Sequence, residues 1–583
     1  MIVFISYRRS CSWELSRLIY NSLKKRGFTV FMDIEDIREG DFDKTLFKNI
    51  ELCDYFLPVL SKGTFDLERI SNPDDWVRRE IEYALTMEKI IIPLISEDFI
   101  FPAENDLPKT LVPFSKKNGV RIPRDFFEEA IEKLTREFFV EKPSVENIPK
   151  EILDQFIFQE EECISLDENI IATFECEADE NSTLEDVCRT IAYDPTIGTW
   201  TSLAEIDRED ILTNYCGKVL LPLPTGDSKQ GRIRIAFPLN IIDASLGGIP
   251  HLLALLGSPF GLKVFKSLRL LNIQIPESFL QSFSGPKFGI DGIYKLLEQE
   301  QNRPLIATML KPRSGLDPTA YAKIAYEALL GGVDLIFDDE LMVSPQSAPL
   351  EKRVPIVDAA VQKAARETGL QKYYAVNVTS SLRSITQTAM HAKELGADLL
   401  YFNPLTAGFS GLEILSENDQ IKLPILCCRS LQGVFHRGNN GIDIYVLMKL
   451  ARIAGADGMH VGSISGKLPH LIAGGADEIK NRTLTLTGKS KHLKPMIPIL
   501  SGGLHPGNIE WNMKNIGNKV ILQAGSGVLG HPDGPYAGGK AMRDLVDGLL
   551  KGYSTYEISK KNDFLYRALQ KWGYVDQGNV KSI

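Results

Sequence analysis

The sequence predicts an α/β protein with two different parallel-sheet units, and three observations support this. Residues 1–140 alternate short apolar strand-like runs with helical patterns, as in a parallel βαβ sheet. Residues 301–552 repeat this alternation eight times, which is the pattern of a (β/α)₈ barrel. Residues 167–300 mix strands and helices less regularly, which indicates an α+β domain. A linker is expected at 141–166, and a C-terminal tail at 553–583.

Composition narrows the classes of function. The chain has 583 residues, a formal net charge of −10 and no run rich in Lys and Arg, so a nucleic-acid partner is not expected. No apolar run reaches the roughly 20 residues of a membrane span. The first residues already belong to a strand, so no signal peptide is expected. The eight cysteines form neither a disulfide framework nor a zinc pattern, which favours a cytoplasmic protein.

The first unit has four strand-like runs, at residues 2–6, 29–32, 55–60 and 90–95. A helical pattern at 13–26 ends at Gly27. Ligands of parallel sheets bind at the carboxyl ends of the strands. Tyr7, Arg8 and Arg9 leave the first strand at that edge.

Residues 74–85 read as a helix that begins near Asp75 and buries a stripe of apolar side chains. Trp76, Glu80 and Tyr83 lie on an adjoining face of this helix. Glu80 is therefore expected beside the core, where a carboxylate is a candidate for chemistry. For a lone glutamate, an ordinary solvated helix acid is the commoner role.

Four motifs in order resemble TIR domains of the NAD-cleaving type, which have a flavodoxin-like parallel sheet. They are residues 4–9 (Phe-Ile-Ser-Tyr-Arg-Arg), 30–33 (Val-Phe-Met-Asp), 37–42 (Ile-Arg-Glu-Gly-Asp-Phe) and 75–81 (Asp-Trp-Val-Arg-Arg-Glu-Ile). The resemblance implies that Glu80 is catalytic and that NAD⁺ is the substrate. It also implies an NAD site formed by Tyr7, Arg8, Arg9, Asp33, Phe42 and Trp76.

The chemistry of NAD⁺ cleavage suits a single carboxylate. Nicotinamide is a good leaving group, so the enzyme must mainly stabilise an oxocarbenium-like ribose. Arg8 and Arg9 are expected to face the pyrophosphate, or to be surface arginines, one of them paired with Asp33. Phe42 and Trp76 are expected to stack on rings or to pack in the core. All eight histidines follow residue 250, so this unit has no histidine base.

Eight strand-like runs define the predicted barrel. They lie at residues 305–310, 333–337, 373–378, 399–402, 425–427, 458–461, 497–501 and 519–523. Upstream, a helix is expected at 149–158 and another at 183–192, and strands at 170–177, 218–222 and 231–238. Polar and glycine-rich residues cluster after the barrel strands, where barrel enzymes keep their sites.

Residues 165–552 resemble the large-subunit superfamily of RuBisCO, which combines a ferredoxin-like α+β domain with a TIM barrel. The motifs are 198–201 (Gly-Thr-Trp-Thr), 311–316 (Lys-Pro-Arg-Ser-Gly-Leu), 331–340 (Gly-Gly-Val-Asp-Leu-Ile-Phe-Asp-Asp-Glu), His460 with 466–468 (Gly-Lys-Leu), 501–505 (Ser-Gly-Gly-Leu-His) and 525–532 (Gly-Ser-Gly-Val-Leu-Gly-His-Pro).

This chain departs from the carboxylase at functional positions. Phe337 stands where the resemblance places the carbamylated, magnesium-binding lysine, which leaves Asp339 and Glu340 as metal ligands. They are expected to hold Mg²⁺ weakly, because Mg²⁺ prefers six oxygen ligands, or to pair with Lys311 and Arg429. Arg313, Cys428 and Pro250 also differ from the carboxylase pattern, so a RuBisCO-like protein without carboxylase activity is expected.

A phosphate site is predicted at the ends of the last two barrel strands. Glycines there let backbone N–H groups point at a phosphate. Tight turns are the alternative explanation. The residues expected to bind this ligand are Ser501, Gly502, Gly503, Gly525 and Ser526, with Lys311, Arg429, His460 and Lys467 facing the rest of it.

Three functions remain open on the sequence. The first is a TIR NAD⁺ glycohydrolase that releases nicotinamide and linear or cyclic ADP-ribose, regulated or scaffolded by a RuBisCO-like module that forms a homodimer or higher oligomer. Its biological role by analogy is antiphage defence. The second is an enolase or isomerase acting on a phosphorylated sugar. The third is a TIR signalling scaffold without enzymatic activity.

Overall fold

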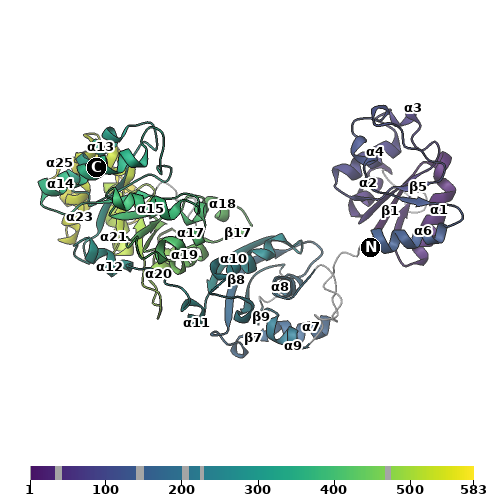
Figure 1. The fold of residues 1–583 in the computed structure, drawn as a ribbon, viewed down its shortest axis with the longest axis horizontal. Coiled ribbons are helices and arrows are strands. Elements are labelled where there is room, and N and C mark those ends of the chain that lie inside the picture. Colours follow the sequence, from purple (N-terminus) through teal and green to yellow (C-terminus); the bar gives the residue numbers. More distant parts are fainter. Residues whose placement is uncertain (1, 33–41, 140–149, 200–208, 224–228, 467–474) are drawn as a thin grey trace. The chain divides into compact units, whose positions relative to one another are not determined.

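The computed structural model describes residues 2–32, 42–139, 150–199, 209–223, 229–466 and 475–583 (Figure 1). The chain divides into two compact units, Met1–Glu146 and Asn147–Ile583, which are described separately below.

The first unit is a parallel sheet with strand order β2-β1-β3-β5-β6, in which the short β4 also pairs with β3. The strands are β1 (Ile2–Tyr7), β2 (Thr29–Met32), β3 (Tyr55–Leu60), β4 (Ile90–Ile91), β5 (Leu94–Ser96) and β6 (Val120–Ile122). The helices are α1 (Arg9–Lys25), α2 (Phe42–Leu52), α3 (Leu67–Ile70), α4 (Trp76–Thr86), α5 (Val112–Ser115) and α6 (Phe127–Lys133).

Both faces of this sheet are buried, which explains its nearly continuous apolar strands. Val3 and Ile5 pack on one side, with residues of α1 and α6. Phe4 points to the other side, where its ring stacks on Phe56 at 5.6 Å in a cluster that includes α4. The run expected as one strand at 90–95 is two strands, since Pro93 has no N–H for the strand ladder.

The second unit begins with a mixed sheet of order β17-β11-β8-β10-β9-β7, in which β8 pairs antiparallel with both β10 and β11. Its strands are β7 (Phe158–Glu160), β8 (Asn169–Ala178), β9 (Lys218–Leu221), β10 (Gln230–Pro238), β11 (Phe265–Gln274) and β17 (Gly441–Ile442). Its helices are α7 (Lys150–Ile157), α8 (Leu184–Tyr193), α9 (Glu209–Tyr215), α10 (Gly248–Gly257) and α11 (Glu277–Leu280).

A closed parallel barrel of eight strands follows, as predicted. Its strands are β12 (Leu305–Met309), β13 (Leu335–Phe337), β14 (Tyr373–Asn377), β15 (Leu399–Phe402), β16 (Ile425–Cys427), β18 (Gly458–Gly462), β19 (Ile497–Leu500) and β20 (Ile521–Gln523). Each strand is buried, because side chains fill the barrel interior and helices cover its outside.

Helices surround this barrel (Figure 1). They include α12 (Gly289–Leu296), α13 (Pro318–Leu330), α14 (Leu350–Thr368), α15 (Ile385–Glu394), α16 (Pro404–Ala407), α17 (Phe409–Glu417), α18 (Gln432–His436), α19 (Ile444–Ile453), α20 (Gly475–Thr487), α21 (Pro506–Ile516), α22 (Gly525–Leu529) and α23 (Gly534–Leu550). The chain continues through α24 (Thr555–Ser559), α25 (Asp563–Trp572), β21 (Tyr574–Asp576) and β22 (Asn579–Lys581).

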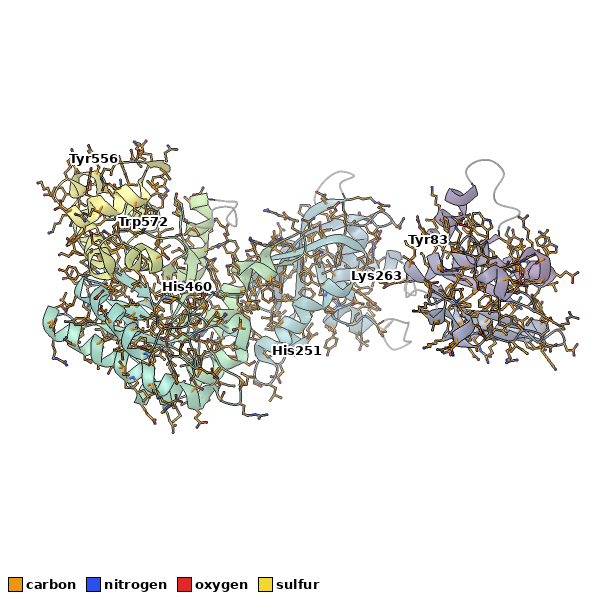
Figure 2. The ribbon with its side chains drawn as sticks, turned by 90° about the horizontal axis from the view of Figure 1, so that it is seen from above. Tyr83, His251, Lys263, His460, Tyr556 and Trp572 are labelled. Carbon is orange, nitrogen blue, oxygen red and sulfur yellow. The ribbon has the colours of Figure 1, made fainter. Side chains whose placement is uncertain are left out.

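His460 on β18 points into the barrel, whereas Tyr556 and Trp572 belong to the C-terminal helices (Figure 2). Those helices pack on α23, where Asn562 donates to Asp544 at 2.7 Å. All eight cysteines lie in the described ranges, and each is a free thiol. Within those ranges, no helix has the length and apolar character needed to cross a bilayer.

Candidate functional site

Helix α4 carries the candidate catalytic carboxylate of the first unit. Asp75 caps the helix by accepting a hydrogen bond from the Arg78 amide at 3.0 Å. Val77 and Ile81 pack into the core, as their spacing predicts. Glu80 is only 8% exposed, although it lies on the face beside that stripe. Helix α4 therefore places the Glu80 carboxylate at the boundary between core and surface.

Arg8 connects the end of β1 to the start of α4. Its Nη1 and Nη2 donate to the two carboxylate oxygens of Asp75 at 2.8 and 3.0 Å, and its Nε donates to the Thr64 carbonyl at 2.7 Å. Three of the five N–H groups of the guanidinium are thus used to hold the two segments together. The sequence offered Asp33 as an arginine partner, whereas the partner of Arg8 is Asp75, the residue expected at the start of the helix.

The other predicted NAD residues lie in different surroundings. Tyr7 is a core residue, with its ring 5.9 Å from that of Trp13. Arg9 is exposed at the first position of α1. Trp76 begins α4 and is 38% exposed, and the Arg79 guanidinium lies 4.4 Å from the centre of its ring. Asp33 lies outside the described residues, and only the backbone of Phe42 is described, at the start of α2.

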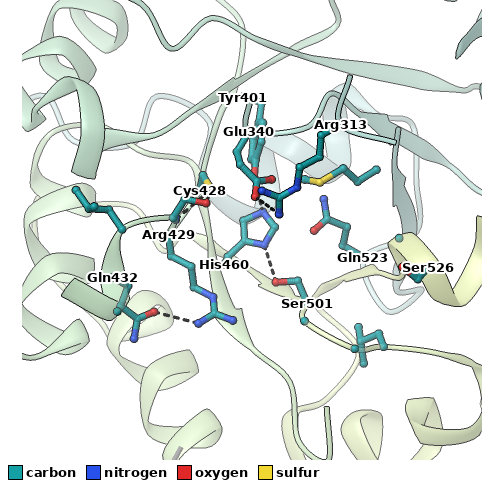
Figure 3. Close-up of a pocket in the computed structure, with 18 of the residues that line it drawn as sticks. Arg313, Glu340, Tyr401, Cys428, Arg429, Gln432, His460, Ser501, Gln523 and Ser526 are labelled. Atoms are coloured by element: carbon teal, nitrogen blue, oxygen red, sulfur yellow. Dashed lines mark hydrogen bonds and ion pairs between the residues drawn. The ribbon is translucent and has the colours of Figure 1, made fainter. Parts of the chain in front are cut away.

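The second unit has a cavity of about 470 Å³ at the carboxyl ends of the barrel strands (Figure 3). Of the residues predicted to bind a ligand there, eight line it: Lys311, Arg429, His460, Ser501, Gly502, Gly503, Gly525 and Ser526. Lys467 lies outside the described residues. Further residues, not predicted from the sequence to bind the ligand, also line the cavity, among them Arg313, Tyr401, Cys428, Gln432, Arg437, Arg482 and Gln523.

His460 lies at the centre of the cavity floor and is 4% exposed (Figure 3). Its Nδ1 lies 2.7 Å from the Ser501 hydroxyl, and its Nε2 lies 3.4 Å from the Tyr401 hydroxyl. Burial, with a further contribution from the nearby Arg429, lowers the pKa of His460 to about 3. The imidazole is therefore neutral near pH 7 and can act as a hydrogen-bonding group there.

Cations dominate one wall of the cavity. Arg429 donates to Gln432 at 3.0 Å, and no carboxylate among the described residues pairs with it. Burial, together with the nearby Arg482, lowers the pKa of Arg429 to about 10. The segment that carries this wall is anchored to the preceding sheet, because Arg269 on β11 donates to the His436 carbonyl at 2.7 Å and β17 pairs with β11.

Backbone and hydroxyl groups line the cavity beside Arg429. Gly502 and Gly503 both have a φ of +92°, a left-handed conformation that glycine adopts without strain. A Cβ at Gly502 would lie 3.4 Å from an Arg429 nitrogen, so this turn and the Arg429 guanidinium are neighbours. Gly525 and Ser526 follow β20 and line the same cavity. The cavity thus brings cations and small polar groups together.

The carboxylates after β13 are held by protein cations. Asp338 is fully buried and accepts from Arg353 at 3.0 Å and from Tyr374 at 2.6 Å. Lys311 contacts Asp339, and Glu340 pairs with Arg313 at 2.9 Å instead of with Arg429. Within the described ranges, no group of three or more His, Cys, Asp or Glu side chains is placed to hold a metal ion.

Phe337 fills the position before these carboxylates. Its side chain is 0% exposed, and its ring packs edge-on against Tyr401 at 5.2 Å and His460 at 6.2 Å. Phe337 itself supplies no oxygen or nitrogen ligand at that point of the barrel interior. The residues that are present therefore do not fit the six-oxygen shell of Mg²⁺.

Comparisons with known proteins identify three regions. Residues 3–135 match the TIR domain family, residues 157–279 match the N-terminal domain of the ribulose bisphosphate carboxylase large chain, and residues 289–572 match its catalytic domain.

Two relatives match the second unit of this chain over at least 90% of their own length. A ribulose bisphosphate carboxylase from Pyrococcus abyssi is 35% identical over 394 residues, which span 67% of this chain and 90% of the relative. A ribulose bisphosphate carboxylase-like protein from Archaeoglobus fulgidus is 32% identical over 427 residues, 70% of this chain and 94% of the relative.

Among solved structures, the octameric carboxylase from Pyrococcus horikoshii in complex with sulfate is similar with a TM-score of 0.65 and 32% identity. The match covers 72% of this chain and 96% of the Pyrococcus horikoshii chain. The chain therefore belongs to the ribulose bisphosphate carboxylase large-chain family and carries a TIR domain ahead of the family's two domains.

Proposed function

We propose that this protein is an NAD⁺ glycohydrolase in which Glu80 of the TIR domain is the catalytic carboxylate. The observation that carries the proposal is the placement of Glu80, 8% exposed on a helix whose start is fixed by the ion pair of Asp75 with Arg8. A carboxylate that is partly shielded from water acts more strongly on a developing positive charge than one in bulk solvent.

The reaction needs little beyond that carboxylate. As the bond between nicotinamide and ribose breaks, positive charge develops on the sugar, and Glu80 stabilises it while binding ribose hydroxyls. Water then attacks to give ADP-ribose, or another part of the ADP-ribose attacks to give a cyclic product. The exposed Trp76, one helical turn from Glu80, offers a ring on which a base can stack.

The direct test is nicotinamide release from NAD⁺ by the purified full chain. Glu80→Ala and Glu80→Gln should each lower turnover by at least about a hundredfold, with less than about 1 kcal/mol lost in the free energy of unfolding. Glu82→Gln is the matched control, since Glu82 lies on the same helix but pairs with Arg78 at 2.7 Å. Glu80→Ala activity within about twofold of the wild type would exclude Glu80 from the mechanism.

For the RuBisCO-like unit, we propose the binding of a phosphorylated small molecule that regulates or scaffolds the TIR domain. Support comes from the wall of cations around Arg429 and the neighbouring turn at Gly502 and Gly503, which together suit a phosphate group. The cavity volume of about 470 Å³ lies within the range of small-molecule sites.

Binding is favoured over turnover by the state of the polar groups in the cavity. His460 has its pKa lowered to about 3, Lys311 is engaged with Asp339, and Arg313 is a poor proton acceptor. Carboxylation is not expected, because Phe337 has no amine to carbamylate. If the wild type turned over a sugar phosphate and both Lys311→Met and His460→Gln lost that activity, an enolase or isomerase would be favoured instead.

We propose an assembly and a biological role by analogy with the two families. The Pyrococcus horikoshii carboxylase is octameric, and we propose that this chain also forms a homodimer or larger assembly through its RuBisCO-like unit. Such an assembly would concentrate TIR domains near one another. NAD⁺ depletion by an assembled TIR enzyme would halt a cell, which is consistent with a role in antiphage defence.

A further inference from the structure

The carboxylates after β13 are surrounded by positive charge that belongs to the protein itself. Lys311 contacts Asp339, whose side chain is 0% exposed, and the Arg313 Nε lies 3.7 Å from the same carboxylate. Arg313 also pairs with Glu340 at 2.9 Å (Figure 3). Two cations therefore occupy the two carboxylates that the family resemblance assigns to Mg²⁺.

Among the described residues, no third His, Cys, Asp or Glu joins Asp339 and Glu340 in a group that could hold a metal ion. Phe337 is packed against Tyr401 and His460, and Asp338 is directed into a buried ion pair with Arg353. Two carboxylates alone fall short of the oxygen shell that Mg²⁺ requires, and the ion loses its water reluctantly. A divalent ion would also have to lie within a few ångströms of Lys311 and Arg313, or displace them, and Coulomb repulsion opposes both.

The net charge of the side chains around the cavity also disfavours a bound metal ion. Five cationic side chains line it among the described residues: Lys311, Arg313, Arg429, Arg437 and Arg482. Three carboxylates pair with members of this set, namely Asp339, Glu340 and Glu478. This leaves a surplus of two positive charges, located at Arg429 and the exposed Arg437. The cavity is already suited to an anion before any metal is added.

We propose that the barrel cavity binds its anionic ligand without a divalent metal, because Arg313 and Lys311 act as built-in cations at Asp339 and Glu340. The ligand class is a small phosphorylated molecule taken up in its metal-free form. The inference rests on the proposed phosphate-binding role of this unit and goes further, since it assigns to two side chains the charge that a metal would supply.

The first experiment measures inorganic phosphate binding to the full chain by calorimetry, in EDTA and in excess Mg²⁺. The two dissociation constants should agree within about twofold, since no metal takes part. An affinity that is about tenfold tighter with Mg²⁺ would overturn the inference. Phosphate binding in neither buffer would overturn the anion-binding role on which it rests, without bearing on NAD⁺ cleavage by the TIR domain.

The second experiment asks whether Arg313 excludes a metal, with Mn²⁺ binding read by electron paramagnetic resonance. Wild type should show no barrel site for Mn²⁺. Arg313→Met frees Glu340 and should gain a weak Mn²⁺ site, in which water completes the coordination of the ion. Glu340→Gln in the same chain should remove that weak site, and Arg313→Lys should gain none. Arg313 is 54% exposed, so these variants are expected to fold.

Arg437→Met is the matched control, because Arg437 lines the same cavity and no carboxylate among the described residues pairs with it. Both methionine variants should weaken phosphate binding by about fivefold, but only Arg313→Met should gain Mn²⁺ binding. Wild-type Mn²⁺ binding that Glu340→Gln removes would overturn the inference. So would Arg313→Met that gains no more Mn²⁺ than Arg437→Met.

Discussion

At the scale of single residues, Arg8 and Asp75 show how the TIR domain positions helix α4. Both side chains are 9% exposed, so each has lost most of its water and depends on the other. Removing one partner of such a pair leaves an uncompensated buried charge, which is far costlier than losing a surface ion pair. Arg8 is therefore expected to act on α4 by holding its first turn.

Arg8→Met should lower the free energy of unfolding of the TIR unit by about 3 kcal/mol and reduce NAD⁺ turnover with it. The double variant Arg8→Met/Asp75→Asn should recover part of that stability, because asparagine still caps the helix and carries no charge. Urea unfolding of both proteins measures this. A double variant no more stable than the single one would show that the ion pair is not the cause.

His460 predicts a pH dependence for the stability of the barrel unit. Its folded-state pKa is about 3, whereas an unfolded histidine titrates near 6.5. Between these values the unfolded chain binds more protons, so the stability contributed by the neutral imidazole is full above about pH 6.5 and is lost as the pH falls towards 3.

The change from about pH 7 to about pH 5 should therefore destabilise the wild type by about 2 kcal/mol more than His460→Gln. Urea unfolding at the two pH values gives the difference. His505, whose pKa burial lowers to about 4, is present in both proteins and cancels. Equal pH dependence of the two proteins would contradict a buried neutral His460.

At the scale of elements, the local pattern of apolar and polar residues predicted most of the strands and helices. The alternation of apolar runs predicted all eight barrel strands within about two residues at each end, and the stripe of Val77 and Ile81 predicted α4. The run at 90–95 was less accurate, because hydrophobicity alone does not register the interruption by Pro93. Strand propensity is local, so these results depend little on the rest of the chain.

The site was predicted less completely, since its partners are far apart in sequence. Arg8 and Asp75 are separated by 67 positions, and nothing local pairs them. Arg482 on α20 lines the barrel cavity, although no sequence motif predicts this position. Arg313 could be placed near the carboxylates only once β12 and β13 were known to be adjacent. Residues that become neighbours only through folding can be identified only once the fold is known.

The end of β13 gives a prediction about carboxylase chemistry. Phe337→Lys alone should not produce Mg²⁺-dependent fixation of carbon dioxide on ribulose bisphosphate, because Asp339 and Glu340 stay paired with protein cations and Cys428 and Pro250 remain. A lysine amine in this apolar cluster should also destabilise the barrel by several kcal/mol. Labelled carbon dioxide fixation above background would contradict this prediction.

At the scale of the whole molecule, two separately folded units share one chain. Residues 150–160 of the stretch expected as a linker form α7 and β7, and β7 pairs with β9 in the sheet of the second unit. The folded part of the second unit thus begins at α7, and the proposed oligomer would carry one TIR domain on each copy of that unit. A ligand can bias that assembly only by binding one arrangement more tightly than another.

We propose that the TIR unit cleaves NAD⁺ under the control of the RuBisCO-like unit. Nicotinamide release per TIR domain tests this most directly, measured for the full chain and for residues 1–142 over a range of concentrations, with and without phosphorylated metabolites. We predict that activity differs between the two proteins, that a ligand changes only the full chain, and that Glu80→Ala silences both. Equal activity at every concentration, unchanged by any ligand, would contradict control by the barrel, and absence of nicotinamide release from both would contradict the enzyme itself.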